Sequence, residues 1–347
     1  MRLPQKNLKK IIRLRMKTQV RKIQALSKYF RILETANDNV HYNFKLPSIL
    51  LMNNIYRSWL QSIFRKTNKN YIIYTHQRHC ELNGQLPIKP FGYIENNMIN
   101  YNDSTLVKQE MGSFTPKNAS ELKLNLFVPQ QDSQQCFIQW NRYRKYWWSS
   151  ITTTPSLFAV NEINYSNDTA EATIVPKFSC GTHTVETIRV ILNDAYSMNP
   201  DARIKNNHHM THLSCSMSLE GALYVLLFDG LHTNEEYLRL HRSMTPYKIS
   251  FALNYTDKTN KESISELAKL MHYKLRKNNI SSFLPNFTLS MEQQINENLQ
   301  LGVAYTAVLC ENTLSTGILN LLCSSTMLKE QVHLADFDAY AVLLFES

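Results

Sequence analysis

Apolar side chains recur every three or four residues in several parts of the chain, which is the spacing of one face of an α-helix. The strongest case is residues 133–150, where three tryptophans fall at helical offsets and Asp132 or Ser133 can cap the first turn. The same spacing predicts further helices over residues 48–64, 185–196, 219–231, 263–277, 289–299 and 337–345.

Strands are predicted where apolar and polar residues alternate. From Leu122 to Val128 every second residue is apolar, and Pro129 closes the run. Shorter runs predict strands at 71–75, 172–178, 213–218, 247–253, 280–284, 303–309 and 317–322. After about residue 245 strands alternate with helices, which is typical of a compact α/β domain with a mixed sheet. We therefore divide the chain into residues 34–242 and residues 243–347.

Positive charge is concentrated at the N-terminus. The chain has 347 residues and a formal net charge of +10. Residues 1–33 contain 11 Lys or Arg and no acid, so the rest of the chain has 27 basic and 28 acidic side chains. Apolar residues from Leu8 to Leu33 recur at helical spacing between the cations, which is typical of a mitochondrial presequence. The alternative is a basic surface helix that stays on the mature protein and contacts anionic lipid or nucleic acid.

The glycines, cysteines and apolar runs exclude several classes of protein. The chain has 8 glycines, and no two have the G-x-G or G-x-x-x-x-G spacing of nucleotide-binding loops. Its 6 cysteines form no C-x-x-C pair, which favours free thiols. No segment approaches the ~18 apolar residues that a membrane span needs. We therefore expect neither a cofactor nor a membrane partner.

A histidine cluster is the candidate metal site. His208, His209, His212 and Cys215 form the pattern H-H-x-x-H-x-x-C, and all four side chains can bind zinc. On a helix, His208 and His212 would share a face. The surrounding pattern indicates a loop that enters a strand instead, which separates the two side chains. We therefore expect a polar loop without a metal.

Four C-terminal segments resemble a known family. They read L-H-R-S-M-T-P-Y-K-I-S-F-A-L (240–253), L-G-V-A-Y-T-A-V-L (301–309), E-N-T-L-S-T-G-I-L (311–319) and T-M-L-K-E-Q-V-H (326–333). They resemble the anticodon-binding domain of class IIa aminoacyl-tRNA synthetases, and more closely the synthetase-derived accessory subunits of the mitochondrial DNA polymerase. Two upstream segments, W-N-R-Y-R-K-Y-W-W (140–148) and L-P-I-K-P-F-G-Y (86–93), resemble the same family.

The resemblance implies a fold with α+β and α/β parts. A degenerate class II synthetase-like domain with an antiparallel sheet would precede an anticodon-binding-like α/β domain with a mixed sheet. It also implies a protein that is not an enzyme. A working synthetase needs arginines on the ATP phosphates, one of them in an R-x-E motif. The chain has no R-x-E triplet, and Ser218-Leu219-Glu220-Gly221 stands where the second arginine motif would be.

Members of this family bind the catalytic polymerase subunit and raise its DNA affinity and processivity. The resemblance therefore implies an accessory subunit in the mitochondrial matrix, at the nucleoid, that meets primer–template DNA mainly through the holoenzyme. About 50 residues separate residue 33 from Leu86, too few for the helical insertion by which vertebrate forms dimerise. We expect the shorter insect type, monomeric before it forms a heterodimer with the catalytic subunit. The alternative is a mitochondrial module that binds tRNA or other RNA.

The resemblance assigns the main partner surface to the C-terminal domain. Gly317 is expected to adopt a positive φ in a tight turn between strands, and a helix is expected near Lys329. The predicted partner-binding residues are Asn312, Gly317, Leu322, Ser324, Thr326 and Lys329. The family's L-R-S-R-D-T motif reads L-L-C-S-S-T at residues 321–326 of this chain. Because this chain lacks both arginines and the aspartate, we expect it to bind its partner through apolar contacts, or to have a partner whose surface has changed correspondingly.

The cations beside the tryptophans are a candidate DNA contact. Arg142, Arg144 and Lys145 would touch phosphates once the polymerase has placed the DNA. The alternative is that the tryptophans pack into the core and the cations lie on the solvated face. Since the chain after residue 33 is almost neutral, we expect weak DNA affinity without the polymerase.

Overall fold

The computed structural model describes residues 17–18, 20–36, 39–75, 90–102, 104–110, 112–166, 168–179, 181–191, 210–232 and 237–345. Within these residues, buried apolar side chains gather into two large cores, one from Val20 to Met244 and one from Ile249 to Ala341. The change from the first core to the second falls between Met244 and Ile249. We use the predicted boundary at residues 242 and 243 to name the first and second domains below.

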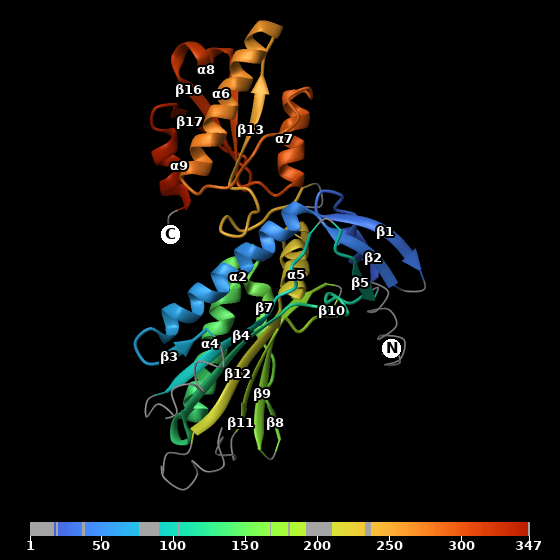
Figure 1. The fold of residues 1–347 in the computed structure, drawn as a ribbon, viewed down its shortest axis with the longest axis vertical. Helices are drawn as coiled ribbons and strands as arrows, with labels where there is room; N and C mark the ends of the chain where they lie inside the picture. Colours follow the sequence, from blue (N-terminus) through green and yellow to red (C-terminus); the bar gives the residue numbers. More distant parts are fainter. Residues whose placement is uncertain are drawn as a thin grey trace, which may run out of the picture.

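A nine-stranded sheet forms the centre of the first domain (Figure 1). Its strand order is β10-β9-β11-β12-β6-β4-β3, with β7 and β8 also paired to β9. Each of these pairs is antiparallel except β3 with β4. The strands are β3 (Ile72–Tyr74), β4 (Phe91–Asn97), β6 (Glu121–Pro129), β7 (Phe158–Val160), β8 (Asn164–Tyr165), β9 (Thr169–Phe178), β10 (Gly181–Thr182), β11 (Glu186–Ile191) and β12 (Met210–Ser218).

Three helices pack with this sheet: α2 (Leu46–Thr67), α4 (Ser133–Ile151) and α5 (Leu219–His232). Short 3₁₀ turns lie at η1 (Gln130–Asp132) and η2 (Pro155–Leu157). Helix α4 buries its three tryptophans, as the spacing predicts. Its predicted cap is absent, because Asp132 makes no side-chain cap bond and the Ser133 hydroxyl donates to the carbonyl of Gln130. The turn η1 leads directly into the helix instead.

The predicted helix at 185–196 is wrong. Its described part up to Ile191 belongs to strand β11, which pairs with β9 and β12. Along β11, buried Glu186, Ile188 and Val190 alternate with less buried neighbours. This period of two places one face of the strand against the core, and β-branched residues favour that conformation.

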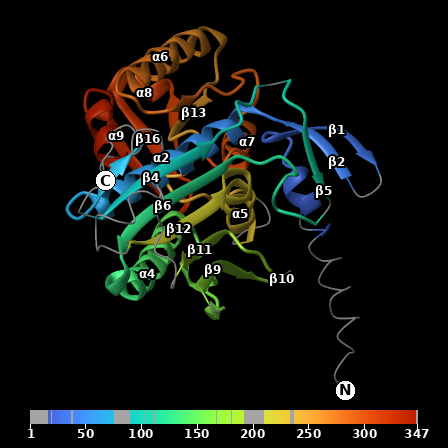
Figure 2. The ribbon, with the colours of Figure 1, turned by 60° about the horizontal axis from the view of Figure 1, so that its bottom comes forward.

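The N-terminal region also differs from the predicted continuous helix. Residues after Gln24 leave the helical conformation, and β1 (Phe30–Ala36) forms a hairpin with β2 (Asn39–Phe44). β2 also pairs with β5 (Val107–Glu110), and this small sheet projects from one side of the first domain (Figure 2). Val20, Ile23, Tyr29 and Phe30 are buried in the first core. The fold therefore uses residues within the predicted presequence 1–33, whose residues 1–16 and 19 lie outside the described part.

The second domain has a five-stranded mixed sheet in the order β14-β13-β15-β16-β17. β13 is parallel to β14 and β15, and the two remaining pairs are antiparallel. The strands are β13 (Ile249–Asn254), β14 (Ser282–Phe283), β15 (Tyr305–Cys310), β16 (Ile318–Cys323) and β17 (Lys329–His333). The helices are α6 (Lys258–Lys277), α7 (Met291–Gln300), α8 (Glu311–Thr316) and α9 (Phe337–Phe345). Lys329 thus begins a strand, so the helix predicted near it is wrong.

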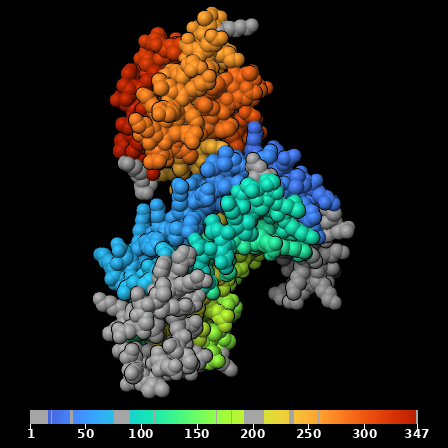
Figure 3. Space-filling view, viewed as in Figure 1, coloured from blue at the N-terminus to red at the C-terminus, as the bar shows by residue number. Residues whose placement is uncertain are grey.

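Specific contacts hold the two domains together at the N-terminal half of α2, where Figure 3 shows the second domain lying against the first. The Tyr29 hydroxyl donates to the carbonyl of Leu301 at 2.8 Å, and Lys28 pairs with Glu297 at 2.8 Å. The Asn54 amide donates to the backbone carbonyls of residues 244 and 245. Leu50 packs against a small apolar cluster of the second domain. The contacts of Leu50 and Asn54 fix the N-terminal half of α2 to the second domain.

Candidate partner-binding surface

Gly317 joins helix α8 to strand β16. Its φ is +72°, its N–H donates to the carbonyl of Thr313 at 3.0 Å, and its carbonyl accepts from the N–H of Leu334 at 2.8 Å. The expected positive φ is confirmed, although the glycine ends a helix and does not lie between two strands. A Cβ atom here would lie 2.7 Å from Nε2 of His333. Any other residue would therefore strain the backbone and displace the His333 ring.

The predicted partner-binding residues do not all reach the surface. Asn312, Thr326 and Lys329 are exposed, and Gly317 is partly exposed. Leu322 is only 3% exposed and Ser324 only 6%. Leu322 pairs with Thr306 of β15 and with Lys329 of β17 within the sheet, so its side chain faces the interior. The structure therefore removes Leu322 and Ser324 from the set of residues that a partner can touch directly.

Four exposed apolar residues that the sequence did not single out lie at the two ends of the β16–β17 hairpin, and we call them the hairpin face. Leu314 lies on α8, Ile318 begins β16, and Met327 and Leu328 lie in the turn between β16 and β17. The exposure of Ile318 can be predicted from strand alternation, because its neighbour Leu319 points into the core. No alternation of apolar and polar residues marks Met327 and Leu328, because they lie in a turn, where Met327 has a positive φ.

The hairpin face has little net charge and borders a sheet edge. β17 is the last strand in the sheet order, and it carries both Lys329 and Glu330. The hydroxyl of Tyr340 donates to the Glu330 carboxylate at 2.6 Å, so this acid already has a hydrogen-bond partner within the domain. An apolar partner surface fits this arrangement better than a charged one, in agreement with the loss of the family's arginines.

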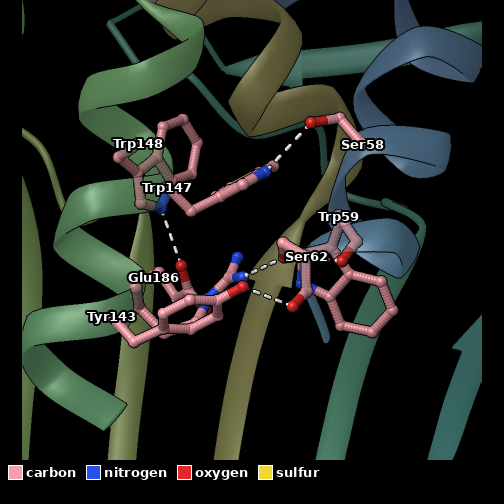
Figure 4. A network of polar contacts seen from close by, with 8 residues as sticks. Ser58, Trp59, Ser62, Tyr143, Trp147, Trp148 and Glu186 are labelled. Carbon is pink, nitrogen blue, oxygen red and sulfur yellow. Dashed lines mark hydrogen bonds and ion pairs between the residues drawn. The ribbon is translucent and has the colours of Figure 1, made fainter. Parts of the chain in front are cut away.

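Arg144 is a structural residue and not an exposed DNA contact. Its side chain is fully buried, its Nε lies 2.6 Å from Oε1 of Glu186, and its Nη1 donates to the Ser62 hydroxyl at 2.9 Å. The Trp148 indole donates to the other oxygen of Glu186 at 2.7 Å, as Figure 4 shows. Arg142 and Lys145, in contrast, are exposed. A single sequence cannot show that Arg144 finds its acid on a strand 42 residues away.

Glu220, in the segment that the sequence analysis compared with a synthetase motif, makes contacts within the first domain. The side chain is buried, its Oε1 accepts from the Tyr101 hydroxyl at 2.7 Å, and its Oε2 accepts from the N–H of Ser120 at 2.8 Å. Burial and the Glu220 charge raise the pKa of Tyr101 well above its usual range. Glu220 therefore connects the start of α5 to the loop before β6, which is a structural role.

The histidine cluster is only partly within the described residues. His208 and His209 lie outside them, while His212 lies on β12 with Nε2 2.9 Å from Oδ1 of Asn125. Burial lowers the pKa of His212 to about 4. Among the described residues, no three His, Cys, Asp or Glu side chains come together as a metal site. No helix in the described part of the chain is long and apolar enough to cross a membrane.

Comparison with known proteins identifies the relatives of the chain. It matches no protein-family model. It is 26% identical over 242 residues to the mitochondrial DNA polymerase subunit gamma-2 of Drosophila melanogaster, covering 65% of this chain and 67% of the fly protein. The frog protein of the same name, from Xenopus laevis, is 24% identical over 259 residues. The chain is similar in sequence to DNA polymerase subunit gamma-2. The predicted resemblance is thus confirmed, while the relation to class IIa synthetases stays a prediction.

The extent of the match differs between relatives. The aligned region covers 68% of this chain but 55% of the frog protein, and 64% of this chain but 53% of DNA polymerase subunit gamma-2 of Mus musculus. The match thus spans about half the length of the vertebrate relatives and two thirds of the fly protein. The names of the fly and frog relatives place those proteins in the mitochondrion.

Proposed function

We propose that the protein is a non-catalytic accessory subunit of the mitochondrial DNA polymerase. The observation that carries the proposal is the match to polymerase subunit gamma-2 over about two thirds of the chain. The subunit would bind the catalytic subunit in the mitochondrial matrix and form a heterodimer with it. It would raise DNA affinity and processivity by slowing dissociation of the polymerase from primer–template DNA, which requires no chemistry of its own.

The hairpin face and the residues around Gly317 are the proposed contact with the catalytic subunit. Exposed Leu314, Ile318, Met327 and Leu328 supply apolar area, and a partner that covers them gains about 25 cal/mol per Å² removed from water. The bond from Leu334 to Gly317 holds α8 beside the end of β17, so the exposed residues of helix and hairpin keep a fixed arrangement. Such preorganisation lowers the entropic cost of binding.

A matched pair of double variants tests this proposal. Leu314→Ala with Leu328→Ala removes two side chains of the hairpin face, which are 43% and 66% exposed. Leu270→Ala with Leu343→Ala is the control, because these leucines of α6 and α9 are 52% and 70% exposed in the same domain. We expect the first pair to weaken binding of the purified catalytic subunit about tenfold or more, since 1.4 kcal/mol is tenfold in affinity. Processivity in a single-encounter primer-extension assay should fall in parallel.

Three results would count against the proposal. Wild-type protein that does not bind the catalytic subunit removes the function itself. Equal binding by both double variants removes the hairpin face from the contact. Capture of folded tRNA in place of the polymerase favours the RNA-binding alternative.

A further inference from the structure

Helices α2 and α4 together contain no acidic residue. Their 22 and 19 residues include six cations, namely Arg57, Arg65, Lys66, Arg142, Arg144 and Lys145. Arg144 is neutralised in the core by Glu186, and the other five reach the surface to some degree. We propose that the outer faces of α2 and α4 form one cationic surface that binds the phosphates of duplex DNA held by the polymerase. The inference rests on the proposed function, because the catalytic subunit delivers the DNA.

Five cations on or beside α2 and α4 have no acidic partner in the part of the chain that the structure describes. Arg65 and Lys66 lie at the end of α2, Lys69 follows in the next turn, and Arg142 and Lys145 lie on α4. None of these five has a carboxylate oxygen within ion-pair distance among the residues that the structure describes. Unpaired cations of this kind are available to replace the counterions of a nucleic acid.

Hydrogen bonds lock helices α2 and α4 side by side (Figure 4). The Tyr143 hydroxyl donates to the carbonyl of Ser62 at 2.5 Å, and the Trp147 indole donates to the Ser58 hydroxyl at 3.0 Å. The Lys66 ammonium lies 5.6 Å from the centre of the Tyr143 ring. These bonds fix α4 against the C-terminal half of α2 and bring the end of α2 beside the middle of α4.

The arrangement of the cations fits a duplex better than a single strand. Arg142 and Lys145 are three residues apart on α4 and therefore neighbours on its surface. Single-strand sites stack successive bases on rows of aromatic side chains in a groove. Here the rows are cations on the outer faces of rigid helices, next to Tyr146, which is 71% exposed and can donate to a phosphate. Contacts of this type bind the DNA backbone without reading its sequence.

The charge of the second domain supports this location. Residues 243–347 contain 8 basic and 10 acidic side chains, so this anticodon-binding-like domain is slightly acidic. A surface of net negative charge repels phosphate, whatever the nucleic acid. We therefore assign the protein partner to the second domain and DNA to the first.

Two quadruple variants of the full chain test the inference. The test variant is Arg65→Gln, Lys66→Gln, Arg142→Gln and Lys145→Gln. The control is Lys261→Gln, Lys269→Gln, Arg276→Gln and Lys277→Gln on α6, which changes the charge equally and includes a lysine over the Tyr255 ring to match Lys66 over Tyr143. Each is assembled with the catalytic subunit, and the Kd for a duplex primer–template is measured from 50 to 200 mM salt.

We expect the test variant to bind the catalytic subunit as wild type does in the absence of DNA. Its holoenzyme should bind DNA at least tenfold more weakly at 50 mM salt, and the slope of log K against log salt should fall by up to about 4, near one per phosphate lost. The control should retain the wild-type affinity and slope.

The other outcomes overturn the inference. Wild-type affinity and slope in the test variant show that the surface does not touch DNA, and an equal loss in the control shows a general effect of net charge. Loss of affinity for folded RNA without loss for DNA assigns the surface to RNA. If wild-type protein does not bind the catalytic subunit, the proposed function fails separately. The same variants, measured as isolated chains against duplex DNA, then decide whether the surface binds DNA phosphates.

Discussion

Removal of residues 17–33 should unfold the first domain. Val20, Ile23, Tyr29 and Phe30 are each at most 2% exposed. Burial of a large apolar side chain contributes about 1.5–3 kcal/mol, so the four together contribute roughly 6–12 kcal/mol. The total stability of a domain is only about 5–15 kcal/mol. The loss would therefore remove most or all of the free energy of unfolding.

The assay compares chains that begin at residue 17 and at residue 34. Both are followed by circular dichroism during thermal unfolding, with size-exclusion chromatography to detect aggregation. We expect the unfolding transition of the first domain in residues 17–347 and its loss in residues 34–347, which should keep only the transition of the second domain with its separate core. N-terminal sequencing of the protein from mitochondria adds a second test, and we expect any cleavage to lie before residue 20. A shorter chain with an unchanged melting temperature would refute the reasoning.

Two further predictions concern buried charge. Glu186→Ala should destabilise the protein by about 3–5 kcal/mol in urea denaturation, because it leaves the Arg144 charge buried and unpaired. Exposed Glu162→Ala should change stability by less than about 0.5 kcal/mol, and an equal loss in both variants would contradict the role of the ion pair. Burial lowers the pKa of His183 and of His212 to about 4, below the usual value of about 6.5. As the pH falls, the two histidines take up protons in the unfolded chain before they do so in the folded protein. The free energy of unfolding should therefore be greatest above pH 6.5 and decrease toward pH 4. The double variant His183→Gln with His212→Gln should show a smaller difference in stability between denaturation at pH 7.5 and at pH 5.

The spacing of apolar residues is enough to predict those elements that bury only one face. The helix at 133–150 is predictable because its tryptophans share one face, and α2 is predictable for the same reason. The segment 185–191 was misread because its apolar residues fit a period of three or four as well as a period of two. Only its pairing with β9 and β12 selects the strand, and those partners are distant in the sequence.

The candidate sites depended even more on distant contacts. Arg144 follows the same basic pattern as Arg142, yet Glu186 on β11 draws it into the core. Leu322 breaks the alternation of β16, since both it and Leu321 are buried between neighbouring strands. The cationic surface of α2 and α4 was half visible in the sequence as Arg142 and Lys145. Its other half needed the bonds that bring α2 beside α4.

Helix α2 also sets a distance. Leu50 and Asn54 near its start contact the second domain, and Lys66 at its end contacts α4. At 1.5 Å per residue, roughly 24 Å of continuous helix lies between Leu50 and Lys66. The helix is therefore a spacer between the surface proposed for the polymerase and the surface proposed for DNA. A polymerase bound at one end would meet its DNA at a fixed offset. Insertion of four residues would lengthen that offset by about 6 Å and rotate the far end by about 40°.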